Sequence, residues 1–327
     1  MSEKLLNVEH YSANMQTDDG TLHILQDINF HVNENECFGI IGESGCGKTM
    51  TSMAVLRYAE RLGLKTTGGS IHFMGEDVLA FSKKRLRRYN GKEAVIILQD
   101  PMQALDPLYT IEKQLLETVY AREKDEPFIS DRKSKAKSEI RSVIRKLSIA
   151  EEKLRCYPHE LSGGMLQRIV GAMVILCQPK LIIADEPTTA LDVSIQLQYL
   201  KLLKQIQKEY HTSIIFISHD IKVISMMCDR IAVMYGGRIV EQGSAKELFE
   251  HPVHPYTRAL FRSGNMGGIP HEQYETIEGN PPDLHQKSVG CPFADRCKHA
   301  RQKCHEEMPE LNIFEGGHEA LCWRPRV

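Results

Sequence analysis

The fold of this chain follows from one stretch of sequence, Gly42-Glu43-Ser44-Gly45-Cys46-Gly47-Lys48-Thr49. The apolar run Phe38-Gly39-Ile40-Ile41 precedes it, and a helical pattern with Met53, Val55 and Leu56 follows it. Strand, glycine-rich loop and helix in this order are typical of a phosphate-binding loop. Glycines let backbone N–H groups surround a phosphate chain, and the helix N-terminus adds a partial positive charge. Lys48 can reach the β- and γ-phosphates, and the Thr49 hydroxyl can ligate Mg²⁺.

Short apolar runs bounded by polar residues recur along the chain and predict buried strands. They lie at residues 94–98, 181–185 and 213–218, and the first is expected to be a buried parallel strand. Between the last two runs, one helix face is predicted from Ile195, Tyr199, Leu202, Leu203, Ile206 and Tyr210. Alternating strands and helices predict an α/β fold with a mostly parallel sheet.

Other segments indicate additions to this sheet. Residues 4–41 predict paired strands around the turn at 17–20, and residues 70–75 another strand. Residues 100–178 predict an inserted helical subdomain, with helices at 111–123, 131–147 and 164–177 and a mobile connection at 124–130. The basic run 83–88 is expected to be a solvated helix face, and 231–243 a terminal hairpin that turns at Gly236-Gly237. A composition shift places a domain boundary near residue 250, between 1–250 and 251–327.

Composition excludes several classes of protein. The chain has 327 residues and a formal net charge of −2, which does not favour binding to nucleic acid. The N-terminus lacks the pattern of a signal peptide, and no apolar run is long enough to span a bilayer. We therefore expect a cytoplasmic protein that docks onto other chains if it serves a membrane process.

Polar residues at the ends of predicted strands are candidates for catalysis. Asp185 ends a buried strand and can hold Mg²⁺, and Glu186 can then activate a water that attacks the γ-phosphate. His219 follows the next strand and can hydrogen-bond the γ-phosphate or the water; alternatively it begins a helix capped by Ser218. Gln99 follows the strand at 94–98 and can sense Mg²⁺ or water.

A second glycine loop, Leu161-Ser162-Gly163-Gly164-Met165, precedes the predicted helix at 164–177. Its hydroxyl, its amides and the helix N-terminus can bind phosphate, but it has no lysine. It is therefore interpreted as half of a site that another protein's phosphate loop completes.

These motifs appear in the order found in the nucleotide-binding subunits of ABC transporters, and the chain resembles that family over residues 1–250. The resemblance rests on loop 42–49, Gln99, loop 161–165, Asp185-Glu186, Ala190-Leu191-Asp192 and His219. It implies a RecA-like P-loop NTPase fold with an N-terminal antiparallel β-subdomain. It also implies a head-to-tail dimer that encloses two ATP molecules. Each ATP would contact one subunit's phosphate loop (residues 42–49 and Met50) and the other's Ser162, Gly163, Gly164 and Asp192.

Further motifs resemble the ATPases of oligopeptide and dipeptide importers. They include Gln99-Asp100-Pro101-Met102, His254-Pro255-Tyr256-Thr257-Arg258 and Gly279-Asn280-Pro281-Pro282. That family implies a second, homologous ATPase subunit, two permeases and an external peptide-binding protein, with the ATPases at the cytoplasmic face of the membrane. A nickel or metal-chelate importer is the alternative, and a soluble ABC ATPase that acts on ribosomes or DNA is a more distant one.

Some positions depart from the family pattern. Met15, with Tyr11 nearby, stands where relatives usually stack an aromatic ring on adenine, and a thioether packs there less strongly. Met50 replaces a second hydroxyl that follows Thr49 in many relatives. None of these changes removes a catalytic group, so the site is expected to be competent.

Four of the nine cysteines, Cys291, Cys297, Cys304 and Cys322, cluster near the C-terminus with the spacing C-x5-C-x6-C-x17-C. This spacing does not match the usual zinc knuckles, although four thiolates can bind Zn²⁺ or an iron–sulfur cluster. The segment resembles the C-terminal region of dipeptide-importer ATPases, some of which hold a 4Fe–4S cluster. A 4Fe–4S cluster, a Zn²⁺ ion and free thiols therefore remain as alternatives.

Overall fold

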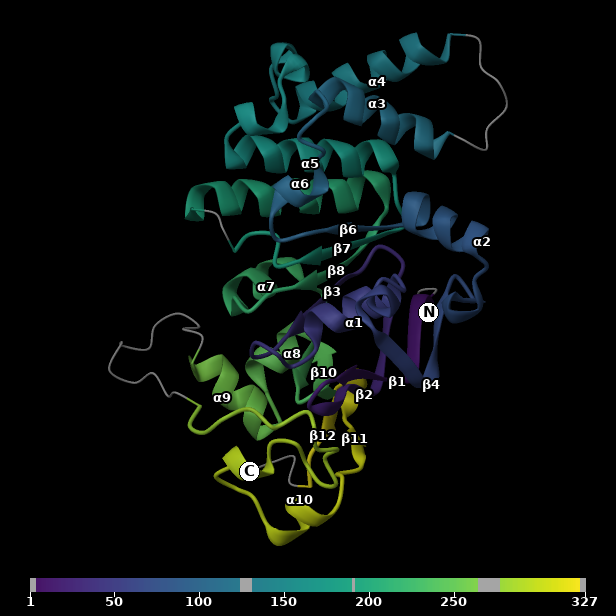
Figure 1. Ribbon diagram of the computed structural model, residues 1–327. Coiled ribbons are helices and arrows are strands. Elements are labelled where there is room, and N and C mark those ends of the chain that lie inside the picture. The colour runs from purple at the N-terminus through teal and green to yellow at the C-terminus, as the bar shows by residue number, and fades with distance from the viewer. Residues whose placement is uncertain (1–3, 124–130, 190–191, 264–276, 324–327) are drawn as a thin grey trace. The chain divides into compact units, whose positions relative to one another are not determined.

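The computed structural model describes residues 4–123, 131–189, 192–263 and 277–323 (Figure 1). The chain divides into two compact units, residues 1–80 with 215–327 and residues 81–214. This division differs from the predicted boundary near residue 250, because the C-terminal extension belongs to the same unit as the phosphate loop. The predicted connection at 124–130 lies outside the described residues.

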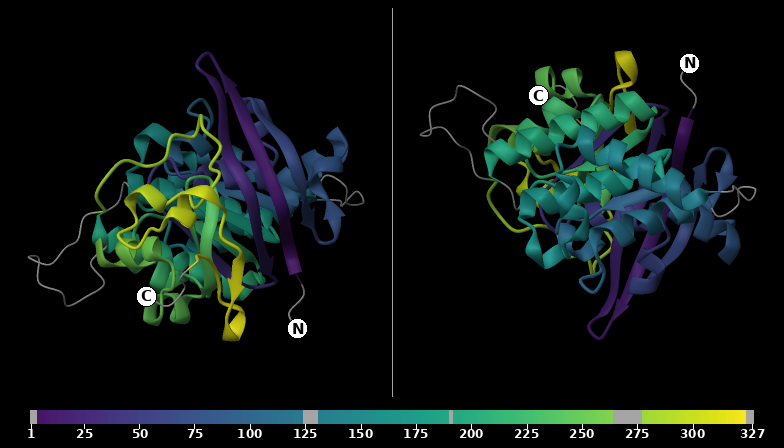
Figure 2. Two further views of the ribbon diagram at one scale, coloured as in Figure 1. Left: turned by 90° about the horizontal axis from the view of Figure 1, so that it is seen from below. Right: turned by 90° about the horizontal axis from the view of Figure 1, so that it is seen from above.

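An antiparallel sheet in the first unit has the strand order β2-β1-β4-β5. Its strands are β1 (Lys4–Thr17), β2 (Gly20–Asn33), β4 (Leu64–Phe73) and β5 (Glu76–Asp77). Figure 2 shows β1 and β2 as long paired strands. Val8 of β1 lies opposite both Phe30 of β2 and Ile71 of β4. These three apolar side chains are buried, and the predicted N-terminal β-subdomain is confirmed.

The larger sheet of the first unit runs in the order β11-β12-β10-β9-β3-β8. Its strands are β3 (Cys37–Ile41), β8 (Ser213–Ile217), β9 (Arg230–Tyr235), β10 (Arg238–Ser244), β11 (Leu311–Ile313) and β12 (Glu319–Leu321). β3 is parallel to β9 and buried along its whole length, as its apolar sequence predicts. β9 and β10 form the predicted hairpin, whose turn residues Gly236 and Gly237 have φ values of 54° and 76°.

The C-terminal extension is built onto this hairpin. β12 pairs with β10, with Glu241 opposite Ala320, and β11 pairs with β12. The yellow segment in Figure 1 accordingly lies beside β10.

The helices of the first unit are α1 (Lys48–Val55), α7 (Ile221–Met227), α8 (Ala245–Glu250), α9 (Pro255–Ser263) and α10 (Gln302–Glu306).

The buried carboxylate of Glu241, in β10, also connects the extension to the sheet. It is 1% exposed and accepts hydrogen bonds from the N–H groups of Val253 (2.7 Å) and His254 (2.8 Å). It also contacts Nε2 of buried His318 at 2.7 Å. The extension therefore continues the core of the first unit.

The second unit contains the predicted helices and two parallel strands. β6 (Ala94–Ile97) pairs with β7 (Leu181–Asp185) in parallel. Its helices are α2 (Lys83–Arg88), α3 (Ile111–Arg122), α4 (Arg132–Lys146), α5 (Gly163–Cys177) and α6 (Val193–Tyr210). α2 has no buried residue, as its basic run predicts.

β6 is less buried than its sequence predicts. Val95 and Ile96 are partly exposed because β6 is the last strand in the order and has a neighbour on one side only. Within the described part of the chain, no helix is long and apolar enough to cross a membrane.

Candidate functional site

The phosphate loop joins β3 to α1 in the first unit. Lys48 begins α1 and is 7% exposed, and its Nζ donates to the carbonyl oxygens of Gly42 (2.8 Å) and Glu43 (2.9 Å). Ser44, Gly45 and Thr49 are exposed. The loop thus presents open backbone and a hydroxyl to the solvent, which suits a site for phosphate.

Two loop glycines are required by close packing. A Cβ atom on Gly42 would lie 2.1 Å from the carbonyl oxygen of Met234, and one on Gly47 would lie 2.8 Å from its Cε. Both glycines also have positive φ, 155° and 107°. The turn of the β9–β10 hairpin adds a direct bond, because the Gly237 N–H donates to the Cys46 carbonyl oxygen at 3.1 Å. Cys46 is buried behind the loop, and burial raises its pKa.

The C-terminal extension also contacts this loop. No pattern in the sequence predicts this contact. The Glu43 N–H donates to the Tyr256 hydroxyl of α9 at 2.9 Å. Arg296 donates from both terminal nitrogens to the Glu43 carboxylate, at 2.6 and 3.0 Å. The sequence signal for such a contact is Glu43 itself, because a carboxylate inside an anion-binding loop needs a cationic partner.

The residues predicted to contact adenine lie on β1. Met15 is partly exposed and lies opposite Leu22 and Leu64. Tyr11 is only 4% exposed, with its hydroxyl 3.1 Å from Thr66 Oγ1, so its ring is part of the core. Of these two residues, Met15 is thus the one with exposed surface on which adenine can pack. Met50, on α1, is partly buried.

His219 follows β8 and is exposed. The Ser218 N–H donates to the Ile40 carbonyl oxygen at 3.4 Å, which places this segment beside the end of β3, where the phosphate loop begins. The cap of the following helix α7 is Asp220, which accepts from Lys222 N–H at 2.9 Å, rather than Ser218. The Ser218 hydroxyl instead accepts from the Asp220 N–H at 3.0 Å.

The second unit carries the other predicted catalytic residues. Asp185 is the last residue of β7 and is 7% exposed. Glu186 has a left-handed backbone with φ 47°, and its Oε2 accepts from Thr189 Oγ1 at 3.0 Å. A non-glycine residue in this region is strained, and such residues occur often at functional sites. Gln99 is exposed immediately after β6.

The second glycine loop forms the start of α5. Ser162 is the N-cap residue, and Ser162 and Gly163 are exposed, which leaves this helix N-terminus open to a ligand. A Cβ atom on Gly164 would lie 3.2 Å from Ile195 of α6. Asp192 caps α6 by accepting from Ser194 and Ile195 N–H, both at 3.0 Å. Its predicted neighbours Ala190 and Leu191 lie outside the described residues.

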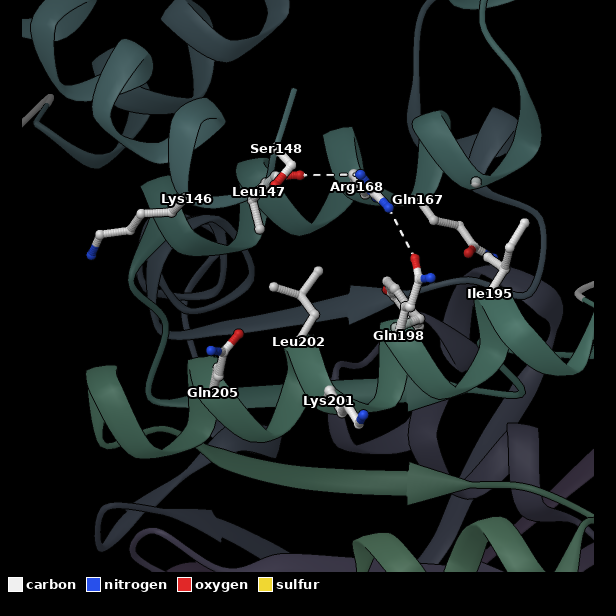
Figure 3. Close-up of a pocket in the computed structure, with 12 residues that line it drawn as sticks. Lys146, Leu147, Ser148, Gln167, Arg168, Ile195, Gln198, Lys201, Leu202 and Gln205 are labelled. Atoms are coloured by element: carbon white, nitrogen blue, oxygen red, sulfur yellow. Dashed lines mark hydrogen bonds between the residues drawn. The ribbon is translucent and has the colours of Figure 1, made fainter. Parts of the chain in front are cut away.

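A cavity of about 180 Å³ lies between α5 and α6 and is lined by Lys146, Arg168, Gln198 and Lys201, among others (Figure 3). Arg168 donates to Gln198 Oε1 at 2.9 Å and to the Leu147 carbonyl oxygen at 3.5 Å. The bond to Gln198 joins the helix that begins at the second glycine loop to the helix capped by Asp192, and the bond to Leu147 joins it to the end of α4.

The four clustered cysteines line one cavity in the first unit, together with His254, Phe293 and Trp323. Burial raises the pKa of Cys291 to about 12, and it raises the pKa of Cys297 as well. His254 is fully buried, with a pKa lowered by burial to about 4, and its Nε2 has no hydrogen-bond partner. Nevertheless, the described residues contain no group of three or more His, Cys, Asp or Glu side chains arranged to hold a metal ion. The predicted metal at these cysteines is therefore not supported by this geometry and stays a prediction.

Comparison with known proteins identifies the class. The ABC transporter family matches residues 25–189, and the family described as oligopeptide/dipeptide transporter, C-terminal region, matches residues 240–304. A solved structure of cbiO1 from Clostridium perfringens, part of an ABC transporter complex, covers 76% of this chain and 91% of its own at 28% identity and TM-score 0.64. The fold is shared with the dimeric ATP-binding cassette MJ0796 bound to ADP and Pi. That structure is 21% identical with a TM-score of 0.63, over 73% of this chain and 98% of its own. Fold and site together define a P-loop ATPase of the ATP-binding cassette class.

The relatives narrow this class further. The chain is 41% identical to the probable peptide ABC transporter ATP-binding protein y4tR of Sinorhizobium fredii, over 99% of this chain and 96% of that protein. It is 39% identical to the dipeptide transport protein DppD of Bacillus subtilis (98% and 95% covered). It is 38% identical to the oligopeptide transport protein OppD of Escherichia coli (99% and 94% covered). The chain belongs to the oligopeptide/dipeptide family of ABC transporter ATP-binding proteins, which confirms the predicted family, the P-loop fold and ATP hydrolysis as the activity.

Proposed function

We propose that this chain is the ATP-hydrolysing motor subunit of an importer of dipeptides or oligopeptides. The observation that carries the proposal is the phosphate loop on β3 and α1, with Lys48 folded onto its carbonyl oxygens. Similarity to peptide-transport ATP-binding proteins over nearly the whole chain supports the substrate class. The nickel alternative is not favoured, because these relatives are named for peptides.

The side chains suit phosphoryl transfer. Lys48 binds the β- and γ-phosphates, and the oxygen donors of Thr49, Gln99 and Asp185 suit Mg²⁺, which neutralises charge on those phosphates when bound. Glu186 orients and deprotonates the attacking water, and His219 holds the γ-phosphate. Met15 packs on adenine.

The exposed N-terminus of α5 supports a two-chain site. Ser162 and Gly163 offer a hydroxyl and amides for phosphate but no lysine, so they complete the site of a second ATPase subunit. ATP then brings the two subunits together, and hydrolysis with phosphate release lets them separate. The resemblance suggests that the second subunit is a homologous chain.

Coupling to transport requires membrane partners. We propose that the chain binds two permeases at the cytoplasmic face of the membrane, and that an external peptide-binding protein delivers the substrate to them. The segment after Gln99 would transmit the motion to a permease. A soluble role on ribosomes or DNA would instead leave the chain without permeases in a detergent extract.

Substitution of Glu186 tests the proposal. Glu186→Gln keeps the size of the side chain but removes the base, so the variant is expected to bind Mg-ATP with at most a few per cent of the hydrolysis rate. The measurement is phosphate release by the purified transporter, with ATP retention in parallel. Glu152→Gln, at an exposed position of the same unit, is the control. Near-normal hydrolysis by Glu186→Gln would remove this residue from its role, and loss of uptake is expected for Lys48→Ala.

We also propose that the four clustered cysteines hold a 4Fe–4S cluster. They line one cavity, and the buried, unpartnered Nε2 of His254 belongs to the same lining, so a group with acceptor sulfur atoms would satisfy an otherwise orphaned polar atom. Cysteine thiolates are the ligands that such clusters use.

Anaerobic purification tests this second proposal. The expected result is a broad absorbance shoulder in the visible, with iron and sulfide in the protein, that Cys291→Ser removes. Cys156→Ser, at a half-buried cysteine outside the cluster, should keep it. Colourless protein without iron would refute the cluster, and stoichiometric zinc would favour the Zn²⁺ alternative.

A further inference from the structure

Glu43 is an acidic residue within the phosphate loop. It lies inside the loop that receives a polyanion, and a carboxylate there repels phosphate unless its charge is compensated. Lys48 bonds to the backbone oxygen of Glu43 and not to its carboxylate. The compensation comes from Arg296, which is 253 residues away in the sequence.

The contact between Arg296 and Glu43 has the geometry of a strong ion pair. Both terminal nitrogens of Arg296 donate to the two carboxylate oxygens, at 2.6 and 3.0 Å, which is a bidentate arrangement. The Arg296 side chain is only 5% exposed and that of Glu43 27%, so solvent screens the pair poorly. These bonds raise the pKa of Arg296 above its usual range, and the guanidinium stays charged.

The rest of the Arg296 side chain is anchored within the extension. Its Nε donates to the Glu278 carbonyl oxygen at 2.9 Å, and a terminal nitrogen donates to the Ile277 carbonyl oxygen at 3.0 Å. The other terminal nitrogen donates to the Tyr235 hydroxyl at 3.1 Å. Every one of these acceptors belongs to the described residues of the first unit, so protein groups of that unit alone hold the Arg296 side chain.

Arg296 is also tied to the cysteine-bearing segment. It ends the short 3-10 turn Ala294–Arg296, which lies between Cys291 and Cys297. Backbone bonds from Ala294 N–H to Cys291 O (3.0 Å) and from Cys297 N–H to Ala294 O (3.2 Å) close this turn. The extension therefore presents the guanidinium from a defined backbone.

We propose that Arg296 is a positioning residue for nucleotide binding, which neutralises Glu43 and holds the phosphate loop in its nucleotide-accepting form. The affinity for Mg-ATP then depends on the C-terminal extension, although no residue of the extension needs to touch the nucleotide. This inference rests on the proposed function, since it takes ATP as the ligand of the loop.

Four variants of the full chain separate charge compensation from simple structural support. Arg296→Met keeps most of the apolar stem, Arg296→Lys keeps the charge, Glu43→Gln removes the carboxylate, and Glu43→Gln/Arg296→Met removes both partners. The control is Arg258→Ala, because Arg258 lies in the same extension and its Nε bonds to the Pro252 carbonyl oxygen. The measurement is equilibrium binding of a fluorescent ATP analogue with Mg²⁺, with melting temperature as the check of folding.

Arg296→Met is expected to weaken binding about tenfold, which corresponds to about 1.4 kcal/mol. Arg296→Lys and the control should stay within about threefold of the wild type, and the double variant should stay within about threefold of Glu43→Gln, because none of them leaves an uncompensated carboxylate in the loop. Rescue of Arg296→Met by Glu43→Gln is the decisive result, since lost packing would not be restored by it.

Two results would overturn the inference: unchanged affinity in Arg296→Met, or a double variant that binds as weakly as Arg296→Met. If Arg296→Met does not fold, the double variant is compared with Glu43→Gln. Binding of Mg-ATP by the double variant that is tenfold weaker than binding by Glu43→Gln would refute charge compensation. A wild-type chain that does not bind Mg-ATP would instead refute the proposed function.

Discussion

Replacement of Gly42 by alanine is the sharpest test of how the phosphate loop is built. The new Cβ would lie 2.1 Å from the Met234 carbonyl oxygen and 2.8 Å from Cys46 Sγ. The first contact is with backbone in the middle of the sheet, so no side-chain rotation can relieve it. Overpacking costs about 1–3 kcal/mol, and a non-glycine residue at φ 155° costs about 1–3 kcal/mol more. We expect a total destabilisation of roughly 2–6 kcal/mol.

Gly45→Ala is the matched control for this substitution. Gly45 also has a positive φ, 79°, but a Cβ atom there would meet no atom within 4 Å. Only the backbone strain of about 1 kcal/mol then applies. The assay is urea unfolding followed by circular dichroism, with Mg-ATP binding measured on the same samples. If Gly42→Ala is as stable as Gly45→Ala and binds ATP normally, the packing argument is refuted.

Three further predictions concern stability. Glu241→Ala leaves two buried donors and one half-buried donor without their acceptor and should cost roughly 3–5 kcal/mol in urea unfolding, whereas the exposed Glu250→Ala should cost almost nothing. Burial holds the pKa of His254 at about 4, below its ordinary 6.5, so the unfolded chain binds the extra proton. Stability should therefore fall as the pH drops from about 6.5 to 4, by up to about 3 kcal/mol. His254→Asn should lose this slope, and an unchanged slope would contradict the argument. Asp192→Ala removes two cap bonds of α6 and should cost about 1 kcal/mol, with Asp192→Asn near wild type.

Several features of the structure have physical reasons that the sequence does not contain. Val95 and Ile96 are apolar but partly exposed, because the position of a strand within a sheet depends on the order of all strands. Tyr11 is buried in the core, and its predicted place near adenine stays a prediction. The domain boundary near residue 250 stays a prediction; Glu241, on one side of it, accepts hydrogen bonds from the backbone of Val253 and His254 on the other side.

The sequence by itself determined the local structure of this protein: the phosphate loop and the strands and helices near it in the chain. Glycines at 42, 45 and 47, the apolar runs of β3 and β7, and the periodicity of α6 act over a few residues, so their spacing was enough to predict loop, strands and helices. Only the tertiary structure decided what lies against the loop. Arg296 and Tyr256 reach Glu43 from more than 200 residues away, through β-strand pairing and buried hydrogen bonds that leave no periodic signal. Contacts of this kind depend on how distant segments pack, and a pattern within one segment cannot encode its distant partner.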